Sequence, residues 1–597
     1  MKLDDTAVGD GPPSIVFVNG VVVTMERDAR LAGPGSTGAQ TGAPRQGDAG
    51  TRAHEHGTAP APATVPEHGN AEARTRGPDT TGAQAFWVKD GKFVCVGTND
   101  EVTAAAPKGT PVADLGGATV LPGLTDCHLH LLDYARGRSQ LDFSAVTTSR
   151  ELTELVAEKV RTAQPGEWIL GQGWNDALWK DRKAPHRDLL DSVSPQNPVF
   201  LSRVDVHTVL VNSLALKTAG VTRDTPDPAG GRVEKEPGTG EPTGVLVDDA
   251  RALVQGLVPQ PTRQSDGRAL QAAITDLTSR GLTAAHDAMA TLELLSLLRE
   301  TDAAGRLALR TSLMLAFDEF ERLEALSADA RADALRPGRV TVRTVKLFAD
   351  GALGSRGALL FEPYSDAPDT RGVEKLTAEE LLEMVKRILR AGLQPAVHAI
   401  GDLANSRLLD AYERCAADSE FRSAFSKLRP RLEHAQLLRR GDVARCGRLG
   451  IIVSVQPPQL MSDMSWTEER VGPERARTAF LFGSLARAGA TLVSGSDLPV
   501  ESCDPFRGIY AAVTRRNLRG EPPGGWLPEE RLSRGAALRS YTLDAAYSSF
   551  EENTHGSIAA GKSADFVVID RDVLTVPEDD IHKTRVLATF AQGRRTA

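Results

Sequence analysis

The sequence has few cysteines, no long apolar run and no excess of basic residues. Five cysteines are scattered over 597 residues, which argues against a disulfide framework and favours reduced thiols in the cytoplasm. No run of about 18 apolar residues occurs, so we expect no membrane span, and the first residues lack the apolar core of a signal peptide. The net charge of −9 argues against a nucleic-acid or membrane surface. We therefore expect a soluble, cytoplasmic protein that binds neither nucleic acid nor a membrane.

One segment near the N-terminus also lacks large apolar residues. Between residues 32 and 85 the only large aliphatic side chain is that of Val65, and no aromatic residue occurs. Such a segment cannot bury enough apolar surface to offset the loss of chain entropy on folding. We therefore predict a disordered low-complexity insertion over residues 28–84.

Two β-hairpins are predicted on either side of this insertion. Ser14–Met25 and Phe86–Gly97 are rich in β-branched and aromatic residues, and each is interrupted by an Asn-Gly or Asp-Gly turn pair. Further strands are expected within Gly556–Asp570 and Val586–Gln592. Because isolated hairpins are marginally stable, we predict that both chain ends combine into a small accessory β-sandwich made of residues 1–27, 85–121 and 556–597.

The remaining chain, residues 122–555, alternates short apolar runs with amphipathic helical stretches. This pattern is typical of parallel β/α winding and predicts an α/β fold, a (β/α)8 TIM barrel, with a large insertion near residues 135–275. The candidate strands are Leu124–His128, Phe200–His207, Leu282–Asp287, Val345–Asp350, Gln394–His398, Arg431–His434, Ile451–Gln456 and Thr491–Asp497.

Residues that can bind metal ions follow one candidate strand after another. His128 and His130 end the first, Lys346 lies in the fourth, and three more residues end later strands: His398, His434 and Asp497. In a (β/α)8 barrel the carboxyl ends of the strands form the active-site mouth. We therefore expect these distant residues to meet in one pocket.

His128 and His130 stand two positions apart, so in an extended segment both imidazoles face the same side, as a zinc site requires. Lys346 lies in an apolar run, where burial lowers the pKa of an amine. A neutral amine can add carbon dioxide and become a carbamate that bridges two cations. The alternative for Lys346 is a buried stem with a solvated ammonium.

His398 and His434 are candidate ligands of a second metal position, although a single histidine after an apolar run is usually structural. Asp497 would bind metal and act as the general base, because a divalent cation acidifies water and a neighbouring carboxylate can accept the proton. The alternative for Asp497 is a helix cap or an Asx-turn.

Six motifs together resemble the amidohydrolase superfamily, specifically its family 3, the YtcJ-like branch that includes proteins similar to N-substituted formamide deformylase. They are LPGLTDCHLH, VKLFADGALGSRGALL, PAVHAIGD, RLEHAQ, VSGSDLPV and GSIAAGKSADFVVID. The resemblance covers residues 14–25 and 86–597. It implies a deformed TIM barrel with an accessory β-sandwich, holding one or two divalent ions, zinc first, with iron or manganese as alternatives.

Carried onto this sequence, the resemblance assigns His128 and His130 to one ion and His398 and His434 to the other. Lys346 would be the carboxylated bridge, and Asp497 the acid/base residue.

Five further residues are candidates for substrate contact. Trp174, Arg203 and His207 lie in segments that resemble pocket-lining segments of the family, although a core tryptophan and an ion-paired arginine would explain the first two equally well. Asp350 and Arg356 flank a glycine-rich stretch after the lysine strand, which would let a loop pass close to the substrate.

The sequence thus predicts a metal-dependent hydrolase that cleaves a non-peptide C–N bond of an N-acyl, N-formyl or cyclic amide with metal-activated water. One alternative is a deaminase of the same superfamily with one metal, in which a bridging Lys346 would have no purpose. Another is a catalytically inactive binding protein on the same fold. The sequence allows a homo-oligomer.

Overall fold

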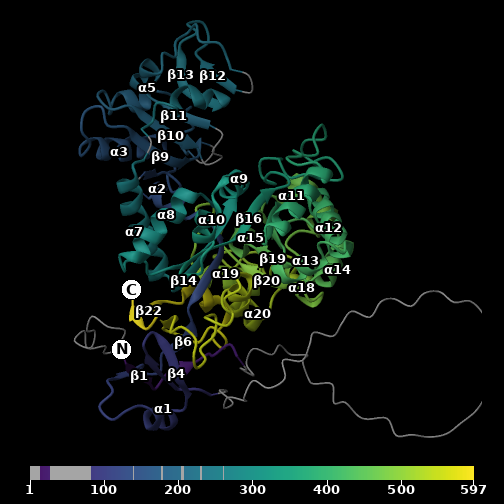
Figure 1. Cartoon of the computed structure of the whole chain (residues 1–597). Helices are drawn as coiled ribbons and strands as arrows, with labels where there is room; N and C mark the ends of the chain where they lie inside the picture. Colours follow the sequence, from purple (N-terminus) through teal and green to yellow (C-terminus); the bar gives the residue numbers. More distant parts are fainter. Residues whose placement is uncertain are drawn as a thin grey trace, which may run out of the picture.

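A nearly closed barrel of eight parallel strands forms the centre of the molecule (Figure 1). The computed structural model describes residues 14–26 and 82–597, except 139, 177–178, 204–207, 229–230 and 260. Around the barrel the strands follow one another in chain order. They are β7 (Leu124–Leu129), β14 (Leu282–Ala290), β15 (Arg310–Ala316), β16 (Val340–Phe348), β17 (Gln394–Ala399), β18 (Arg431–His434), β19 (Ile452–Val455) and β20 (Thr491–Ser494).

The barrel nearly closes between its first and last strands. Leu129 at the end of β7 forms a parallel bridge with Leu498, which follows β20. The main-chain N–H of Asp497 donates to the carbonyl of His128 at 2.7 Å. The carboxyl ends of β7 and β20 therefore lie side by side, and the predicted α/β barrel fold is confirmed.

Two strand assignments were wrong. The predicted strand Phe200–His207 is not part of the barrel, because its described portion, β10 (Val199–Arg203), pairs within another sheet. The third barrel strand, β15, was not predicted. His286 and Asp287 belong to Leu282–Asp287, which was predicted as the third strand but lies in the second, β14. Hydrophobic patterning indicates that a segment is a strand but not which sheet it joins, and both segments are buried apolar runs.

The six-stranded sheet that contains β10 is inserted between β7 and β14, and Figure 1 shows it standing apart from the barrel, at the top of the view. In spatial order its strands are β12 (Gly231–Lys235), β13 (Pro242–Asp248), β11 (Thr208–Val211), β10, β9 (Ile169–Trp174) and β8 (Leu141–Asp142). Its helices are α3 (Ser149–Val160), α4 (Asp188–Asp191), α5 (Ser213–Thr218) and α6 (Ala252–Gln255).

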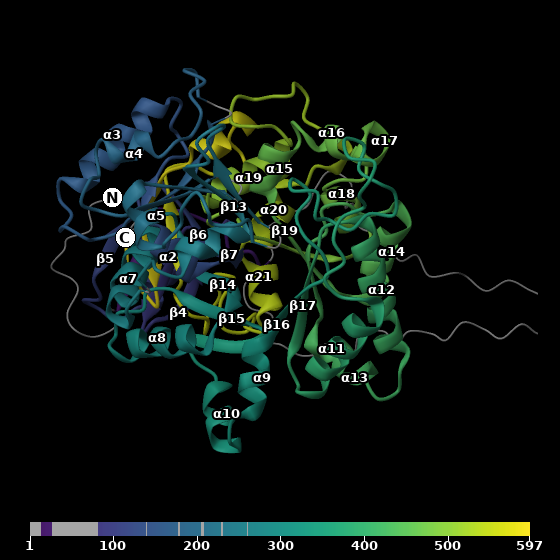
Figure 2. The ribbon, with the colours of Figure 1, turned by 90° about the horizontal axis from the view of Figure 1, so that it is seen from above.

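Amphipathic helices surround the barrel, and α11 (Ala378–Arg390) illustrates why they form. Thr377 caps its first turn reciprocally with Glu380, which satisfies two main-chain N–H groups. Figure 2 shows α11 and α12 beside β16 and β17. The other helices are α2 (Leu131–Gly137), α7 (Arg263–Ser279), α8 (Leu292–Ala303), α9 (Phe317–Ala325), α10 (Ala328–Ala334), α12 (Asp402–Ala417), α13 (Arg422–Leu428), α14 (Arg440–Leu449), α15 (Pro457–Asp463), α16 (Thr467–Val471), α17 (Pro473–Ala476), α18 (Phe482–Arg487), α19 (Pro505–Thr514), α20 (Arg534–Ser540) and α21 (Leu543–Ser548).

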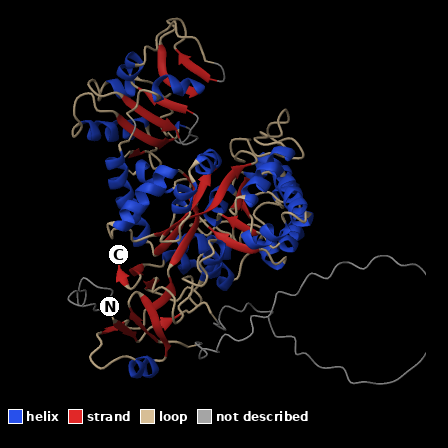
Figure 3. Cartoon of the chain, in the orientation of Figure 1, coloured by secondary structure: helices blue, strands red, loops and turns tan. Residues whose placement is uncertain are grey.

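Strands from both ends of the chain form two further sheets, drawn below the barrel in Figure 3. Aromatic rings from both sheets stack in one shared core: Phe17, Phe86, Phe93, Phe566 and Phe590. One sheet contains β4 (Lys92–Gly97), β3 (Ala85–Lys89), β1 (Ile15–Val18) and β5 (Val112–Asp114), with α1 (Asn99–Ala105) beside it. The other contains β2 (Val21–Val22), β6 (Thr119–Pro122), β21 (Phe566–Ile569), β22 (Val586–Ala591) and β23 (Arg594–Arg595).

The predicted low-complexity insertion, residues 28–84, lies almost entirely outside the described residues, and the proposed domain boundaries stay predictions. All five cysteines are free. No described helix is long and apolar enough to cross a membrane.

Candidate metal centre

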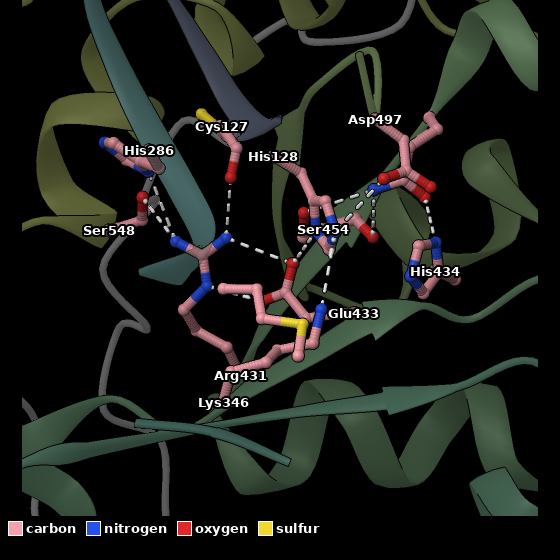
Figure 4. A network of polar contacts seen from close by, with 12 residues as sticks. Cys127, His128, His286, Lys346, Arg431, Glu433, His434, Ser454, Asp497 and Ser548 are labelled. Atoms are coloured by element: carbon pink, nitrogen blue, oxygen red, sulfur yellow. Dashed lines mark hydrogen bonds and ion pairs between the residues drawn. The ribbon is translucent and has the colours of Figure 1, made fainter. Parts of the chain in front are cut away.

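His128 and His130 both reach the carboxylate of Asp497, although Asp497 is hundreds of residues away. Figure 4 shows His128 beside Asp497. Nε2 of His128 lies 3.6 Å and Nε2 of His130 lies 3.2 Å from Oδ1 of Asp497. The alternation of β7 places these two rings on one side, while Leu129 between them packs into the apolar core.

Asp497 is held in an unusual main-chain conformation. Its φ is 61°, a left-handed value that costs energy for a residue with a side chain and often occurs at functional sites. Gln459 Nε2 donates to Oδ2 at 3.0 Å, so the carboxylate is fixed from two sides. A Cβ on the nearby Gly495 would lie 2.5 Å from the main-chain nitrogen of His128, so only glycine permits this close approach.

Lys346 is buried at the base of this pocket, with 1% of its surface exposed. Its Nζ lies 3.4 Å from Nε2 of His128 and 4.8 Å from the ring centre of Phe348. Burial lowers the pKa of the Lys346 amine to about 8. About a tenth of the amine is therefore neutral, and thus nucleophilic, at pH 7.

His398 and His434 complete the cluster from β17 and β18. The two ring centres are 4.5 Å apart, and the His434 ring is 4.8 Å from that of His128. Gln456 Oε1 accepts a hydrogen bond from Nδ1 of His434 at 2.9 Å, which leaves Nε2 with its lone pair. Nε2 of His398 instead faces the carbonyl of Gly351 at 3.5 Å.

A buried ion pair behind His128 was missed by the sequence reasoning. Glu433 Oε2 accepts from Nδ1 of His128 at 2.6 Å, and Glu433 Oε1 accepts from Nε of Arg431, also at 2.6 Å. Arg431 in turn donates to the carbonyl of Cys127 at 3.0 Å. Figure 4 shows Arg431 and Glu433 beneath the cluster. Such a partner fixes the tautomer of a metal-binding histidine and directs its Nε2 into the pocket.

The local electrostatics favour neutral imidazoles at His128 and His434 beside an ionised carboxylate, whereas at His130 the hydrogen bond to Asp497 outweighs burial and raises the pKa. Burial, reinforced by Lys346, lowers the pKa of His128, and burial lowers that of His434 to about 3. Burial alone would raise the pKa of Asp497, but the hydrogen bond from His130 and the other histidines outweigh it and lower the pKa.

This donor set fits a divalent metal ion. One ligand atom each from His128, His434 and Asp497 lies within 4.8 Å of the other two, close enough to converge on one ion. Neutral imidazoles and a carboxylate are the ligands that zinc and similar metals take in hydrolytic sites.

A family model described as "Amidohydrolase family" matches residues 111–597. The chain belongs to the amidohydrolase family. This membership confirms the family predicted from the six sequence motifs.

Two relatives align over most of this amidohydrolase. It is 34% identical to "Putative amidohydrolase YtcJ" of Bacillus subtilis (strain 168), over 86% of this chain and 95% of that protein. It is 30% identical to "N-substituted formamide deformylase" of Arthrobacter pascens, over 88% of this chain and 96% of that protein.

A solved structure of an uncharacterized metal-dependent hydrolase from Pyrococcus furiosus superposes with a TM-score of 0.70 at 25% identity. The match covers 94% of this chain and all of that one (100%). The family membership and this neighbour make the chain a hydrolytic enzyme with a small-molecule substrate. Together with the histidine and aspartate cluster, they indicate a divalent metal.

Two of the five predicted substrate contacts lie near the loop that follows β16 in the amidohydrolase barrel. Asp350 is fully buried and accepts three main-chain N–H groups, from Leu359, Ile400 and Gly401. It also faces His398 at 3.5 Å, so its geometry favours holding the loop and that histidine in place. Arg356 is paired with Asp366 at 2.8 Å.

The other predicted contacts belong to the inserted six-stranded sheet. Trp174 is buried in the apolar core of the insertion and donates to the carbonyl of Leu201 at 2.9 Å. Arg203 pairs with Asp176 at 2.9 Å. Both positions match the structural alternative considered from the sequence. His207 lies outside the described residues.

Proposed function

We propose that this amidohydrolase is a metal-dependent hydrolase that cleaves a non-peptide C–N bond of an N-formyl, N-acyl or cyclic amide. The observation that supports it is the meeting, in one buried cluster, of the six predicted residues: His128, His130, Lys346, His398, His434 and Asp497. They come from β7, β16, β17, β18 and the segment after β20. A barrel mouth is where such convergence produces catalysis.

In this proposal His128 and His130 hold one divalent ion, and His398 and His434 hold a second. Lys346 would bridge them as a carbamate, which would form when its neutral amine adds carbon dioxide and releases one proton. The short distance from Lys346 Nζ to His128 Nε2, 3.4 Å, and the lowered pKa of the amine support this assignment. Zinc is the expected metal, with iron or manganese as alternatives.

Asp497 is the proposed acid/base residue. When bound, divalent ions polarise a carbonyl and lower the pKa of water. Because the Asp497 carboxylate stays ionised, it can accept the proton of the attacking water and pass it to the departing nitrogen. Gln459 donates to Oδ2 of this carboxylate and holds it in position for both transfers.

The formamide deformylase relative supports amides with a small acyl group as the first substrates to test. The formyl group is the smallest acyl group, so it needs the least space beside the closely packed imidazoles of His128, His398 and His434.

The test combines elemental analysis of the purified protein with a substrate screen. We expect one or two equivalents of divalent metal, and release of amine from N-formyl, N-acyl or cyclic amides that stops when a chelator removes the metal and returns when the metal is restored. Turnover that survives complete metal removal, or protein that binds no divalent metal, would contradict the proposal.

A further inference from the structure

A cavity of about 560 Å³ lies between the helices of the barrel and the two sheets built from the chain ends. Its walls come from α7, the end of α8 with the loop that follows, and two turns, at residues 90–91 and 591–596. Arg339, which also lines it, immediately precedes β16, so the cavity lies at the amino ends of the barrel strands, whereas the metal cluster lies at their carboxyl ends. Its volume is within the range of small-molecule sites.

Hydrogen bonds hold the walls of this cavity together. Thr589 of β22 donates to the carbonyl of Thr278, near the end of α7, at 2.7 Å, and Figure 1 shows β22 and the end of the chain next to α7. The N–H of Ala564 donates to the carbonyl of Gly91, and the N–H of Gly593 donates to the carbonyl of Ala564, both at 2.8 Å. The two turns are thereby tied to each other, and β22 is tied to the barrel.

The charged side chains that line the cavity are mainly basic. They are Arg306, Arg339, Arg594 and Arg595, with Asp90 and Asp302 as the acidic ones. The lining side chains therefore carry an excess of two positive charges. Positive charge concentrated in a concave surface attracts anions.

Arg339 uses little of its hydrogen-bonding capacity. Its side chain is 15% exposed, and a guanidinium has five N–H donors. Among the described residues its only acceptor is the carbonyl of Leu307, 3.1 Å from Nη2, and Nε makes no hydrogen bond. Oδ1 of Asp302 lies 3.5 Å from Nε, too far to satisfy it. Burial lowers the pKa of this guanidinium, so the protein compensates its charge only in part.

The uncharged part of the wall is rich in groups that accept hydrogen bonds. Oε1 of Gln271 is buried and accepts none from the described residues. The hydroxyls of Thr275 and Thr278 each donate to a main-chain carbonyl, which leaves their oxygen lone pairs free to accept. Such a wall suits a ligand that carries several hydroxyl groups.

We infer that this cavity is a second binding site and that it takes a sugar phosphate. A phosphate monoester carries a charge of about −1.5 to −2 near neutral pH, which matches the excess of two positive charges. Its oxygens accept paired hydrogen bonds from guanidinium groups, while the sugar hydroxyls donate to Gln271 and the threonines. Because the site is separate from the metal cluster, the inference does not depend on the proposed function.

The test is calorimetric titration of the protein with ribose 5-phosphate, inorganic phosphate and ribose. Metal-free and metal-loaded protein are both used, since phosphate can also bind a metal ion. The variants are Arg306→Met and Arg595→Met, because both side chains are exposed and neither change should disturb folding. Arg414→Met is the matched control, since Arg414 is an exposed arginine of α12, outside the cavity.

We expect ribose 5-phosphate to bind both forms of the wild-type protein with the same affinity, inorganic phosphate to bind more weakly, and ribose not to bind. Each cavity variant should weaken ribose 5-phosphate binding by about tenfold, as the loss of one charge-assisted hydrogen bond would give. Arg414→Met should leave it unchanged. Hydrogen exchange should slow at residues 302–308 and 591–596 when ribose 5-phosphate is bound.

The inference would be overturned if the wild-type protein did not bind ribose 5-phosphate, or if both cavity variants bound it as tightly as the wild type. Equal weakening in Arg414→Met, or protection from exchange only around the metal cluster, would place the binding elsewhere and would also overturn it. Inorganic phosphate that binds as tightly as ribose 5-phosphate would refute the sugar part of the assignment.

Discussion

At the scale of single residues, the cluster depends on side chains whose charge and orientation are set by their immediate neighbours. Lys346 is the clearest case. Its side chain is 1% exposed, and keeping a buried ammonium charged costs free energy, which favours the neutral amine. His128 is another, since its Nδ1 is committed to Glu433 and its Nε2 faces the pocket. Three predictions belong to this scale.

Replacing Lys346 by alanine should lower bound metal and activity together. If the carbamate bridges two ions, its loss removes a ligand from each, and we expect at least about a tenfold weaker metal affinity, the low end for loss of a supporting group. Metal competition with a chromogenic chelator and formate or amine release measure the two effects. Lys386→Ala is the control. A Lys346→Ala protein with full metal content and full activity would refute the bridge.

Reloading of metal-free protein should depend on pH through the Lys346 amine. Its pKa is lowered from 10.5 to about 8, so the neutral fraction rises as pH increases through about 8. At constant dissolved carbon dioxide, loading of the second ion should become about tenfold faster between about pH 7 and 9. Stopped-flow metal uptake checks this. A rate that is independent of both pH and carbon dioxide would argue against a carbamate.

Breaking the Arg431–Glu433 pair should have two separable effects. Glu433→Ala leaves a buried guanidinium without its partner and should destabilise the protein by about 3–5 kcal/mol. It should also weaken metal binding by about 10–100-fold, because His128 loses its orienting acceptor.

The double variant Arg431→Met/Glu433→Leu separates these effects. It should recover most of the stability, because neither charge of the Arg431–Glu433 pair remains. It should not recover the metal affinity, because His128 still lacks its acceptor. Chemical denaturation of metal-free protein and metal competition titrations give the two values. Wild-type metal affinity in the double variant would show that the pair does not position His128.

At the scale of strands and helices, the alternation of side chains along a β-strand explains the positions of the cluster residues on β7 but not on β18. It places His128 and His130 on one side of β7, as expected from their spacing. On β18 the adjacent residues Glu433 and His434 both lie beside the His128 ring, which strict alternation forbids. The φ of 77° at His434 and of 47° at Ala435 turns the chain so that both side chains face the pocket.

The sequence could not reveal this turn, because neither residue is a glycine. The Arg431–Glu433 pair could have been predicted from the sequence. Two opposite charges two positions apart in a buried strand face the same side of the sheet, and burial is least costly when they pair with each other. The six candidate ligands could be proposed from the sequence, because each lies at or near a strand end and their residue types suit metal chemistry.

The close contact between β7 and β20 gives a prediction at this scale. A methyl group at position 495 would lie 2.5 Å from the main-chain nitrogen of His128. Gly495→Ala should therefore push Asp497 away from His128, destabilise the protein by about 1–3 kcal/mol and weaken metal binding.

Gly441→Ala is the matched control. A Cβ at this helical position meets nothing within 4 Å, so the change should be neutral or stabilising by about 0.4–1 kcal/mol. Thermal unfolding with and without metal compares the two variants. Equal behaviour of both would show that the two strands can separate without harm to the site.

At the scale of the whole molecule, the sequence predicted the barrel and the β-structure built from both chain ends, but it assigned one strand of the inserted sheet to the barrel. Val199–Arg203 and Arg310–Ala316 are both buried apolar segments, and only their hydrogen-bonding partners assign one to the inserted sheet and the other to the barrel. Trp174 and Arg203, predicted as substrate contacts from the family resemblance, both have partners inside the insertion, and their role in substrate binding stays a prediction. Local pattern identifies elements, and long-range pairing decides their neighbours.

The central claim is that six side chains from distant parts of the chain form one metal centre. The most direct test is an anomalous difference map from crystals of the zinc-loaded protein, recorded on both sides of the zinc absorption edge. The account predicts one peak within bonding distance of His128 and His130, beside Asp497, and a second ion, where present, within bonding distance of His398 and His434. Zinc bound only elsewhere, or the absence of any peak between these side chains in fully loaded protein, would contradict it.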